Sequence, residues 1–170
     1  MPYLMTRDGY LHDLDDSFEM IMKYDIVFVG EDHGSRVAHE AEFTLLTGLV
    51  ERDPALVLAL EMFERDVQHT LDDYLRGRIS EEIFLEAARP WPNYQEDYRP
   101  LIQLAKIRGI PVIAANVPRR AAAAVAVANK LSPEVVGEDK IYLPTSLHPR
   151  SKDTTGASST RSKECLTGLP

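Results

Sequence analysis

The stretch that decides the fold is Ile26-Val27-Phe28-Val29-Gly30-Glu31-Asp32-His33. Its first four residues are strong β-formers, and such an apolar run predicts a buried strand. The glycine lets the backbone turn sharply because it carries no Cβ. Two acids and a histidine follow where the strand should end. The stretch therefore predicts a strand that delivers polar side chains to its carboxyl end.

The same layout recurs twice further along the chain. Residues 56–60 are apolar and run into Glu61, and residues 111–115 are apolar and run into Asn116. In an open parallel α/β sheet, ligands bind beyond the carboxyl ends of the strands, and neighbouring strands lie roughly 5 Å apart. We therefore expect four polar side chains from these strand ends to converge on one pocket: Glu31, His33, Glu61 and Asn116.

Helical patterns occupy the sequence between the apolar runs, with apolar residues recurring every three or four positions. The expected helices cover residues 14–24, 35–52, two segments of 65–88 interrupted at Arg76-Gly77-Arg78, 100–108 and 119–130. Strands that alternate with helices predict an α/β fold with a parallel sheet. We expect a three-layer arrangement, in which a mostly parallel sheet is flanked by helices.

Size and composition indicate one soluble domain. With 170 residues, 44% of them hydrophobic, the chain can bury a single core. A net charge of −8 argues against nucleic acid or an anionic membrane as the main partner. No apolar stretch reaches transmembrane length, and the first residues lack the pattern of an export signal. The lone Cys165 excludes an internal disulfide. These features predict a cytoplasmic protein.

The last twenty residues differ in composition from the rest of the chain. Residues 151–170 are rich in Ser, Thr, Lys and Gly and show neither helical nor strand periodicity. Such a segment buries too little apolar surface to offset the entropy lost on ordering. We expect a folded domain over residues 1–150 and a disordered tail over residues 151–170.

Two histidines make a candidate metal site. His33 and His39, with a carboxylate from Glu31 or Glu61, form a ligand set suited to a transition metal. The spacing His-x₅-His matches no standard metal motif, however. His39 also shares a helix face with Phe43, which fits a packing role equally well.

Two tyrosines and an arginine are further candidates. Tyr94 and Tyr98 are four residues apart, so a helix there would bring both rings to one face, either in a binding site or in packing. Arg119 begins a helix directly after a strand end, a position suited to binding a carboxylate or phosphate. A solvated arginine is the alternative.

Five motifs together resemble a known family. They are Val27-Phe28-Val29-Gly30-Glu31-Asp32-His33, His39, Leu60-Glu61-Met62-Phe63, Trp91-Pro92-Asn93-Tyr94 with Tyr98-Arg99-Pro100-Leu101, and Ala115-Asn116-Val117-Pro118-Arg119. In order and spacing they resemble the ChaN-like family of haem-binding uptake proteins, of the Tiki and erythromycin-esterase-like superfamily. The resemblance covers about residues 25–149.

The resemblance implies a haem-binding protein of iron uptake or storage, in which a dimer holds haem with a tyrosine as iron ligand and a histidine nearby. A phenolate is a hard anionic donor and suits ferric iron. The candidate haem-binding residues are Glu31, His33, His39, Glu61, Tyr94, Tyr98, Asn116 and Arg119, with His33 and His39 as candidate metal ligands. Relatives in this family are often exported.

Two alternatives stay open. The wider superfamily includes metal-dependent hydrolases, which use glycine-x-x-histidine turns and a strand-end glutamate, matched here by Gly30 to His33 and by Glu61. A divalent metal would then activate water, with Glu31 or Glu61 as base. The family domain also continues beyond the position of Pro149 with a further strand, so the chain is alternatively a non-functional truncated fragment.

Overall fold

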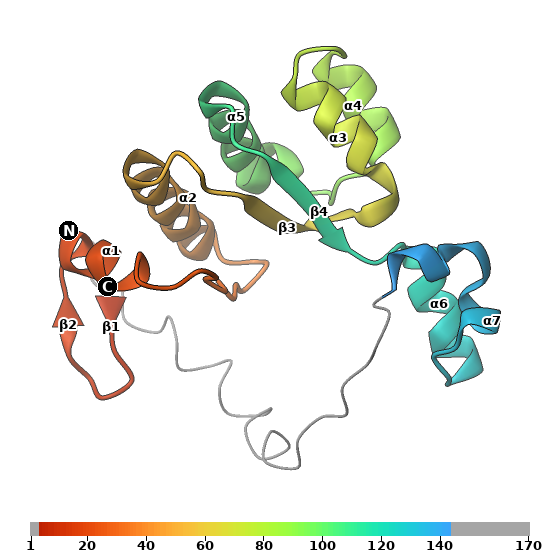
Figure 1. Cartoon of the computed structure of the whole chain (residues 1–170), viewed down its shortest axis with the longest axis horizontal. Coiled ribbons are helices and arrows are strands. Elements are labelled where there is room, and N and C mark those ends of the chain that lie inside the picture. The colour runs from red at the N-terminus through yellow and green to blue at the C-terminus, as the bar shows by residue number, and fades with distance from the viewer. Residues whose placement is uncertain (1–3, 144–170) are drawn as a thin grey trace. The chain divides into compact units, whose positions relative to one another are not determined.

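The computed structural model describes residues 4–143. These residues belong to two units, residues 4–53 and residues 54–143, and each unit is described by itself (Figure 1). The predicted disordered tail, residues 151–170, lies outside the described residues, so this expectation stays a prediction.

The first unit contains a small hairpin and two helices. Strands β1 (Leu4–Met5) and β2 (Leu11–His12) pair antiparallel. Helix α1 (Leu14–Ile21) begins after Asp13, whose carboxylate accepts from the Asp16 backbone N–H at 2.8 Å. Helix α2 (Arg36–Arg52) begins after Ser35, whose side chain accepts from the backbone N–H of Ala38. Both caps satisfy backbone donors that the first turn leaves without a helical partner.

The strand predicted at residues 26–29 does not form. Residues 26–29 adopt no regular secondary structure, and their side chains are exposed, Phe28 to 93%. β-propensity expresses how well a residue fits a pleated, half-buried surface, so a strand needs a neighbour to pair with. Within the described first unit, the hairpin strands pair only with each other. Among the described residues, the apolar run therefore makes none of the interstrand backbone hydrogen bonds that the predicted strand would have made.

The second unit is built around two parallel strands. Strand β3 (Leu58–Glu64) pairs in parallel with β4 (Val112–Asn116), with Leu58 opposite Val112, Glu64 opposite Asn116, and an irregular register after Leu60. The Gln68 side chain borders the other edge of β4, because it donates to the carbonyl of Val112 and accepts from the N–H of Ala114, each at 2.8 Å. This amide satisfies backbone groups that a further strand would otherwise take.

Helical segments connect and cover the two strands (Figure 1). In chain order they are η1 (Arg65–Val67), α3 (Gln68–Leu75), α4 (Glu81–Ala88), the π-helical turn η2 (Tyr94–Tyr98), α5 (Arg99–Arg108), α6 (Arg119–Ala128), α7 (Pro133–Val136) and η3 (Gly137–Tyr142). Helix α5 ends at Gly109, which has a φ of 68° and forms the left-handed C-terminal turn for which glycine is favoured. The predicted helix positions are confirmed to within a few residues at each end.

One strand boundary also needs correction. The apolar run at residues 56–60 predicted a strand ending before Glu61, but β3 starts at Leu58 and continues to Glu64. Glu61 therefore lies within the strand, and Glu64 is the carboxylate at its carboxyl end. The third predicted strand agrees with β4 to within one residue.

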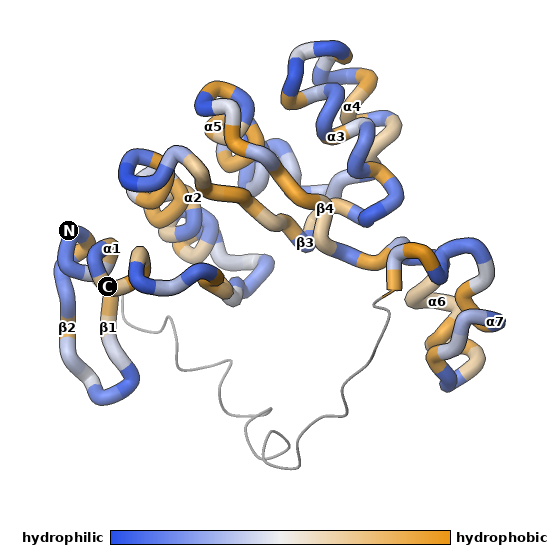
Figure 2. Tube along the Cα trace, viewed as in Figure 1, coloured by the Kyte–Doolittle hydropathy of each residue, from blue (hydrophilic) through white to orange (hydrophobic). Residues whose placement is uncertain are grey.

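The core of the second unit gathers around the β3–β4 pair. Leu60, Met62, Val112 and Ala114 are buried, with Glu61 and Ile113 between them exposed, and Phe63 of β3 is also fully buried. Figure 2 shows hydrophobic residues along both strands. Aromatic rings extend this core between the helices: Phe84 stacks on Tyr74 at a centroid distance of 4.5 Å and contacts Phe63 at 5.7 Å. A parallel pair flanked by helices confirms an incomplete α/β fold.

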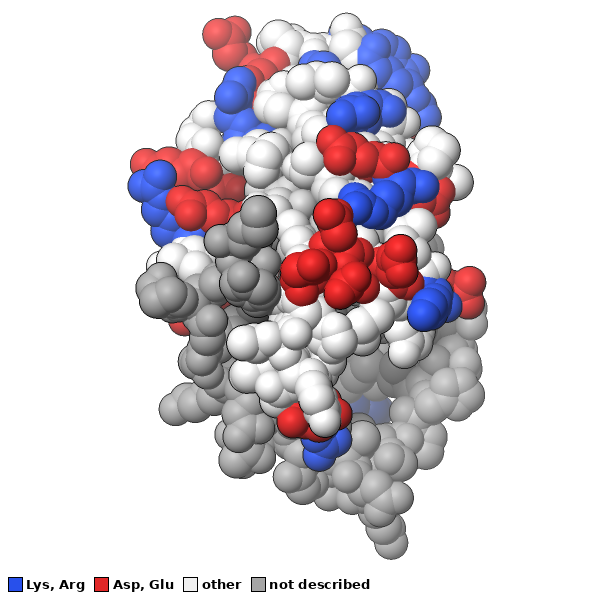
Figure 3. All heavy atoms as spheres, turned by 90° about the vertical axis from the view of Figure 1, so that its left-hand side faces the viewer, with Lys and Arg blue, Asp and Glu red and all other residues white. Residues whose placement is uncertain are grey.

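The surface carries charges of both signs. Figure 3 shows acidic side chains gathered near the middle of the face in view, with basic side chains around them. The chain has 27 acidic and 19 basic residues, which accounts for its net charge of −8. Among the described residues, no helix combines the length and the apolar character needed to cross a membrane.

Candidate functional site

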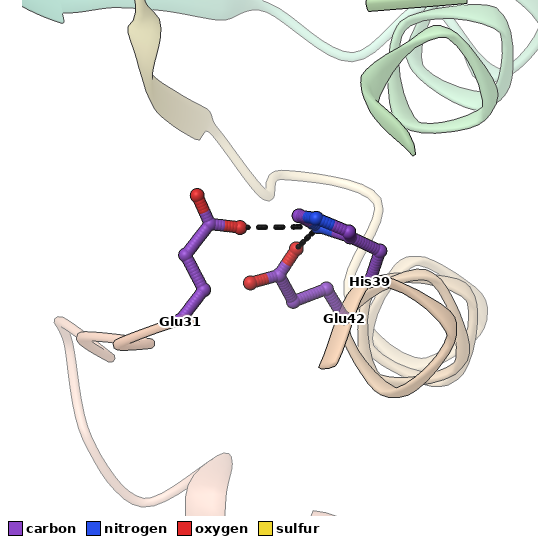
Figure 4. Close-up of side chains that lie close together, drawn as sticks. All are labelled: Glu31, His39 and Glu42. Carbon is purple, nitrogen blue, oxygen red and sulfur yellow. Dashed lines mark hydrogen bonds and ion pairs between the residues drawn. The ribbon is translucent and has the colours of Figure 1, made fainter. Parts of the chain in front are cut away.

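Three side chains of the first unit form a compact group of nitrogen and oxygen ligands, here called the Glu31–His39–Glu42 cluster (Figure 4). Glu31 comes from the loop before α2, and His39 and Glu42 come from one face of α2, three residues apart. Nδ1 of His39 lies 3.2 Å from Oε2 of Glu31 and 3.4 Å from Oε2 of Glu42. One imidazole nitrogen thus faces two carboxylates.

His33 contacts this cluster twice. Its Nδ1 lies 2.5 Å from Oε1 of Glu31, and its backbone carbonyl lies 3.2 Å from Nε2 of His39. A carbonyl only accepts hydrogen bonds, so this contact requires a proton on Nε2 of His39. The Nδ1 atom of His39 is therefore the nitrogen available to interact with the carboxylates.

The cluster is removed from water. The side chains of His39, Glu31 and Glu42 are 4%, 8% and 14% exposed. Burial, together with the neighbouring Glu31, raises the pKa of Glu42 to about 7, and the contact with His39 opposes this increase. Ionisation of both carboxylates at this distance is unfavourable unless a cation lies between them.

The donor types in the cluster suit a divalent metal ion. Imidazole nitrogen and carboxylate oxygen are the usual ligands of zinc, manganese and iron(II). The sequence singled out His33, His39 and Glu31, and the structure brings Glu31 and His39 together with His33 beside them. Sequence reasoning missed Glu42, although its spacing, His-x-x-Glu on a predicted helix, could have indicated a shared face.

The remaining candidates lie in the second unit. Glu61 is exposed on β3, and Asn116 ends β4 opposite Glu64. Because Glu31 and His33 belong to the first unit, the expected convergence of Glu31, His33, Glu61 and Asn116 stays a prediction.

Arg119 lies at the first turn of α6, beside a cavity of about 520 Å³ lined by Glu64, Arg89, Arg119, Arg120 and Ala123. Its backbone N–H donates to Oε2 of Glu64 at 3.1 Å, and its guanidinium is exposed. The neighbouring Arg120 is engaged differently, since it binds Asp139 through two nitrogens and Asp66 through a third. Arg119 is thus the more accessible of the two arginines for an anionic ligand.

Tyr94 and Tyr98 are buried within the second unit. Tyr94 contacts Phe63 and Phe84 through its ring, and Tyr98 contacts Trp91 edge-on at a centroid distance of 6.0 Å. Burial, reinforced by Tyr74 and Glu81, raises the pKa of Tyr94 above that of an ordinary phenol. This environment disfavours the phenolate form of Tyr94, and the assignment of Tyr94 and Tyr98 to a haem site stays a prediction.

Exposed aromatic, imidazole and apolar side chains lie in the first unit. Tyr10 and Tyr24 are exposed tyrosines, and the side chain of His33 is 54% exposed. The apolar side chains of residues 26–29 are also exposed. The described first unit therefore presents exposed phenol, imidazole and apolar side chains.

Comparison with known proteins gives two matches. The sequence profile of the family described as "Haem-binding uptake, Tiki superfamily, ChaN" matches residues 17–164. Among curated proteins, the chain is 29% identical over 108 residues to Protein RETICULATA-RELATED 5, chloroplastic, from Arabidopsis thaliana. That alignment covers 59% of this chain and 15% of the plant protein, so the chain spans only a small part of that relative. No solved structure matches the chain.

Proposed function

The chain belongs to the ChaN family of haem-binding uptake proteins in the Tiki superfamily, and from this premise we propose that it binds haem in iron uptake or storage. The observation that carries the proposal is the extent of the family match, residues 17–164. This range includes every candidate site residue of the sequence, among them the Gly30-Glu31-Asp32-His33 turn.

The exposed apolar run of the first unit is the proposed haem surface. Phe28 is 93% exposed, and His33 follows five residues later. An apolar ring surface beside an accessible imidazole or phenol is what a haem pocket requires. We propose that residues 26–29 contact the macrocycle and that His33 or the exposed Tyr24 faces the iron. Haem would supply the ferric iron that these groups ligate.

The second-unit candidates have different proposed roles. The exposed guanidinium of Arg119 suits a carboxylate ligand. Glu61 and Asn116 offer polar groups on and at the end of the parallel strands, but no contact yet assigns them to haem. For Tyr94 and Tyr98 we favour packing over ligation, because both phenols are buried.

Two finer proposals concern assembly and location. The family resemblance implies a homodimer around haem, which sedimentation with and without hemin would test. The cytoplasm is the proposed location, and fractionation of cells that express the tagged chain would test it.

Hemin titration of the purified full chain tests the haem proposal. We expect a shifted Soret band that saturates with hemin, and a changed spectrum for the iron-facing variant, either His33→Ala or Tyr24→Phe. Tyr10→Phe is the matched control, since Tyr10 is also an exposed tyrosine of the first unit. If hemin does not bind saturably, the haem proposal is wrong, and the result would support the alternative of a non-functional fragment.

Metal-dependent hydrolysis is the second candidate, and the Glu31–His39–Glu42 cluster is the observation that favours it. A metal held there could activate water, and a carboxylate could take its proton. Hydrolysis of ester or peptide substrates that requires added Zn²⁺ or Mn²⁺ and is lost in Glu31→Gln would support this candidate. Haem binding without any such hydrolysis would exclude it.

A further inference from the structure

We infer that Glu31, His39 and Glu42 bind one divalent transition-metal ion directly, at a site that does not require haem. The ligand atoms are Nδ1 of His39 and one carboxylate oxygen from each glutamate, and all three lie within 4.8 Å of one another. Figure 4 shows the two carboxylates directed at the same edge of the imidazole ring.

The spacing of the ligand atoms matches a metal coordination sphere. A tetrahedral ion with bonds of about 2.1 Å holds its ligand atoms about 3.4 Å apart, and an octahedral ion holds adjacent ligands about 3.0 Å apart. The distances from Nδ1 of His39 to the two carboxylate oxygens are 3.2 Å and 3.4 Å. An ion could therefore enter with small side-chain movements.

The surrounding contacts orient the ligands as a second coordination shell does. The carbonyl of His33 accepts from Nε2 of His39, which leaves the lone pair of Nδ1 directed at the carboxylates. The imidazole of His33 binds the other oxygen of Glu31 at 2.5 Å. Both a histidine ligand and a carboxylate ligand are thus held in place by one residue outside the ligand set.

Charge balance also favours a divalent ion. Two carboxylates and a neutral imidazole carry two negative charges, in side chains that are at most 14% exposed. One proton shared by the group leaves one negative charge buried, whereas a divalent ion leaves none. Because unbalanced buried charge is costly, the metal-bound state is the one in which the cluster is electrostatically complete.

The donor set indicates the class of metal. One imidazole and two carboxylates, with no thiolate in the cluster, suit Zn²⁺, Mn²⁺ or Fe²⁺ better than Cu⁺. Three protein ligands also leave at least one position for water, as in sites that keep a coordination position open. The competing explanation is a protonated His39 that bridges the two carboxylates without a metal.

Metal binding by the full chain distinguishes these explanations. The purified protein is stripped with EDTA and dialysed against Zn²⁺ or Mn²⁺ without hemin, and bound metal is measured by mass spectrometry. We expect about one ion per chain and an affinity at least about 10-fold lower in Glu42→Gln, which keeps the shape of the side chain. Glu40→Gln is the matched control, because Glu40 lies on the same helix and pairs with Arg36 at the surface.

Circular dichroism confirms that each variant is folded, and His39→Asn provides a second ligand substitution if Glu42→Gln is unstable. Equal metal affinity in Glu42→Gln, His39→Asn and Glu40→Gln would overturn the inference, as would a wild-type chain that retains no metal. Since hemin is absent throughout, failure here leaves the haem proposal intact, and a failed hemin titration leaves this site intact.

Discussion

The imidazole of His33 lies 2.5 Å from Oε1 of Glu31, the carboxylate whose other oxygen faces His39. An accessible histidine thus holds a buried acid in position. His33 bonds one oxygen of Glu31 while the other oxygen lies near His39, so the arrangement of the cluster depends on a residue that is not among its proposed ligands.

Replacing His33 should weaken metal binding without removing a ligand. We expect His33→Ala to lower the affinity for Zn²⁺ about 10-fold, because loss of a contact to a ligand typically costs 10- to 100-fold in affinity. Calorimetric titration measures the change. His69→Ala, an exposed histidine of the second unit, should leave the affinity unchanged, and an equal loss in both variants would contradict a positioning role for His33.

Phe28 tests the proposed haem surface. Phe28→Asp should lower hemin affinity, because it places a charge in the apolar run, yet it should change the free energy of unfolding by only about 0.5 kcal/mol, since the ring is exposed. Hemin titration and urea unfolding measure the two effects. Unchanged hemin affinity would place the macrocycle elsewhere.

The buried tyrosines should behave as packing residues. Tyr94→Phe combined with Tyr98→Phe keeps both rings and removes both phenols, so we expect the hemin spectrum to stay the same. Absorption spectroscopy across the visible range measures this. Loss of a tyrosinate band in the double variant would instead show that one of these phenols reaches the iron.

Gly48 on α2 faces the ring of Phe18 on α1 so closely that a Cβ would overlap it. Overpacking typically costs about 1–3 kcal/mol, and the overlap of the added Cβ with several atoms of the Phe18 ring puts Gly48→Ala in the upper part of that range. The net effect should be destabilising, because better helix propensity returns only about 1 kcal/mol. Urea unfolding measures the net effect.

A double variant isolates the cause. In a Phe18→Ala background the overlap is gone, so Gly48→Ala should become neutral or stabilising. Gly34→Ala is the control, because a Cβ there meets nothing within 4 Å. Destabilisation that persists without the Phe18 ring would refute the overpacking explanation.

Acid should weaken one ion pair between α4 and α5. Two hydrogen bonds from Arg99, of 2.6 and 2.8 Å, hold the pKa of Glu81 below its usual 4.5. A lowered pKa means that the stabilisation is complete above about pH 4.5 and is lost as pH falls through the lower folded value.

Unfolding experiments at pH 7 and at lower pH check this dependence. We expect Glu81→Gln to cost about 1 kcal/mol or less at pH 7 and to lose less stability on acidification than the wild type. Glu82→Gln, an exposed neighbour in the same first turn, should retain the wild-type pH dependence. If Glu81→Gln lost more stability on acidification than the wild type, the Glu81–Arg99 ion pair would not be the cause of the pH dependence.

The sequence predicted the elements whose signals are local. The helix ranges follow from such signals: Ser35 and Ser80 cap α2 and α4, and Gly109 ends α5, because capping and left-handed turns depend on a few neighbouring residues. The family motifs are likewise local, and the family match confirms the resemblance that they indicated.

Tertiary structure decided what local signals leave open. The run at residues 26–29 has strong β-propensity, but strand formation depends on a partner that propensity does not contain. The end of β3 at Glu64 follows from its pairing with β4, and Gln68 borders that pair through contacts more than forty residues away in sequence.

The candidate metal site divides in the same way. The sequence by itself determined that Glu31, His33 and His39 are close along the chain and chemically suited to a metal. Only the tertiary structure decided that Glu42 joins them and that His33 supports Glu31 and His39 from outside the ligand set. The physical reason is that ligand geometry depends on how a loop folds back on α2, and side-chain spacing along the sequence does not specify that path.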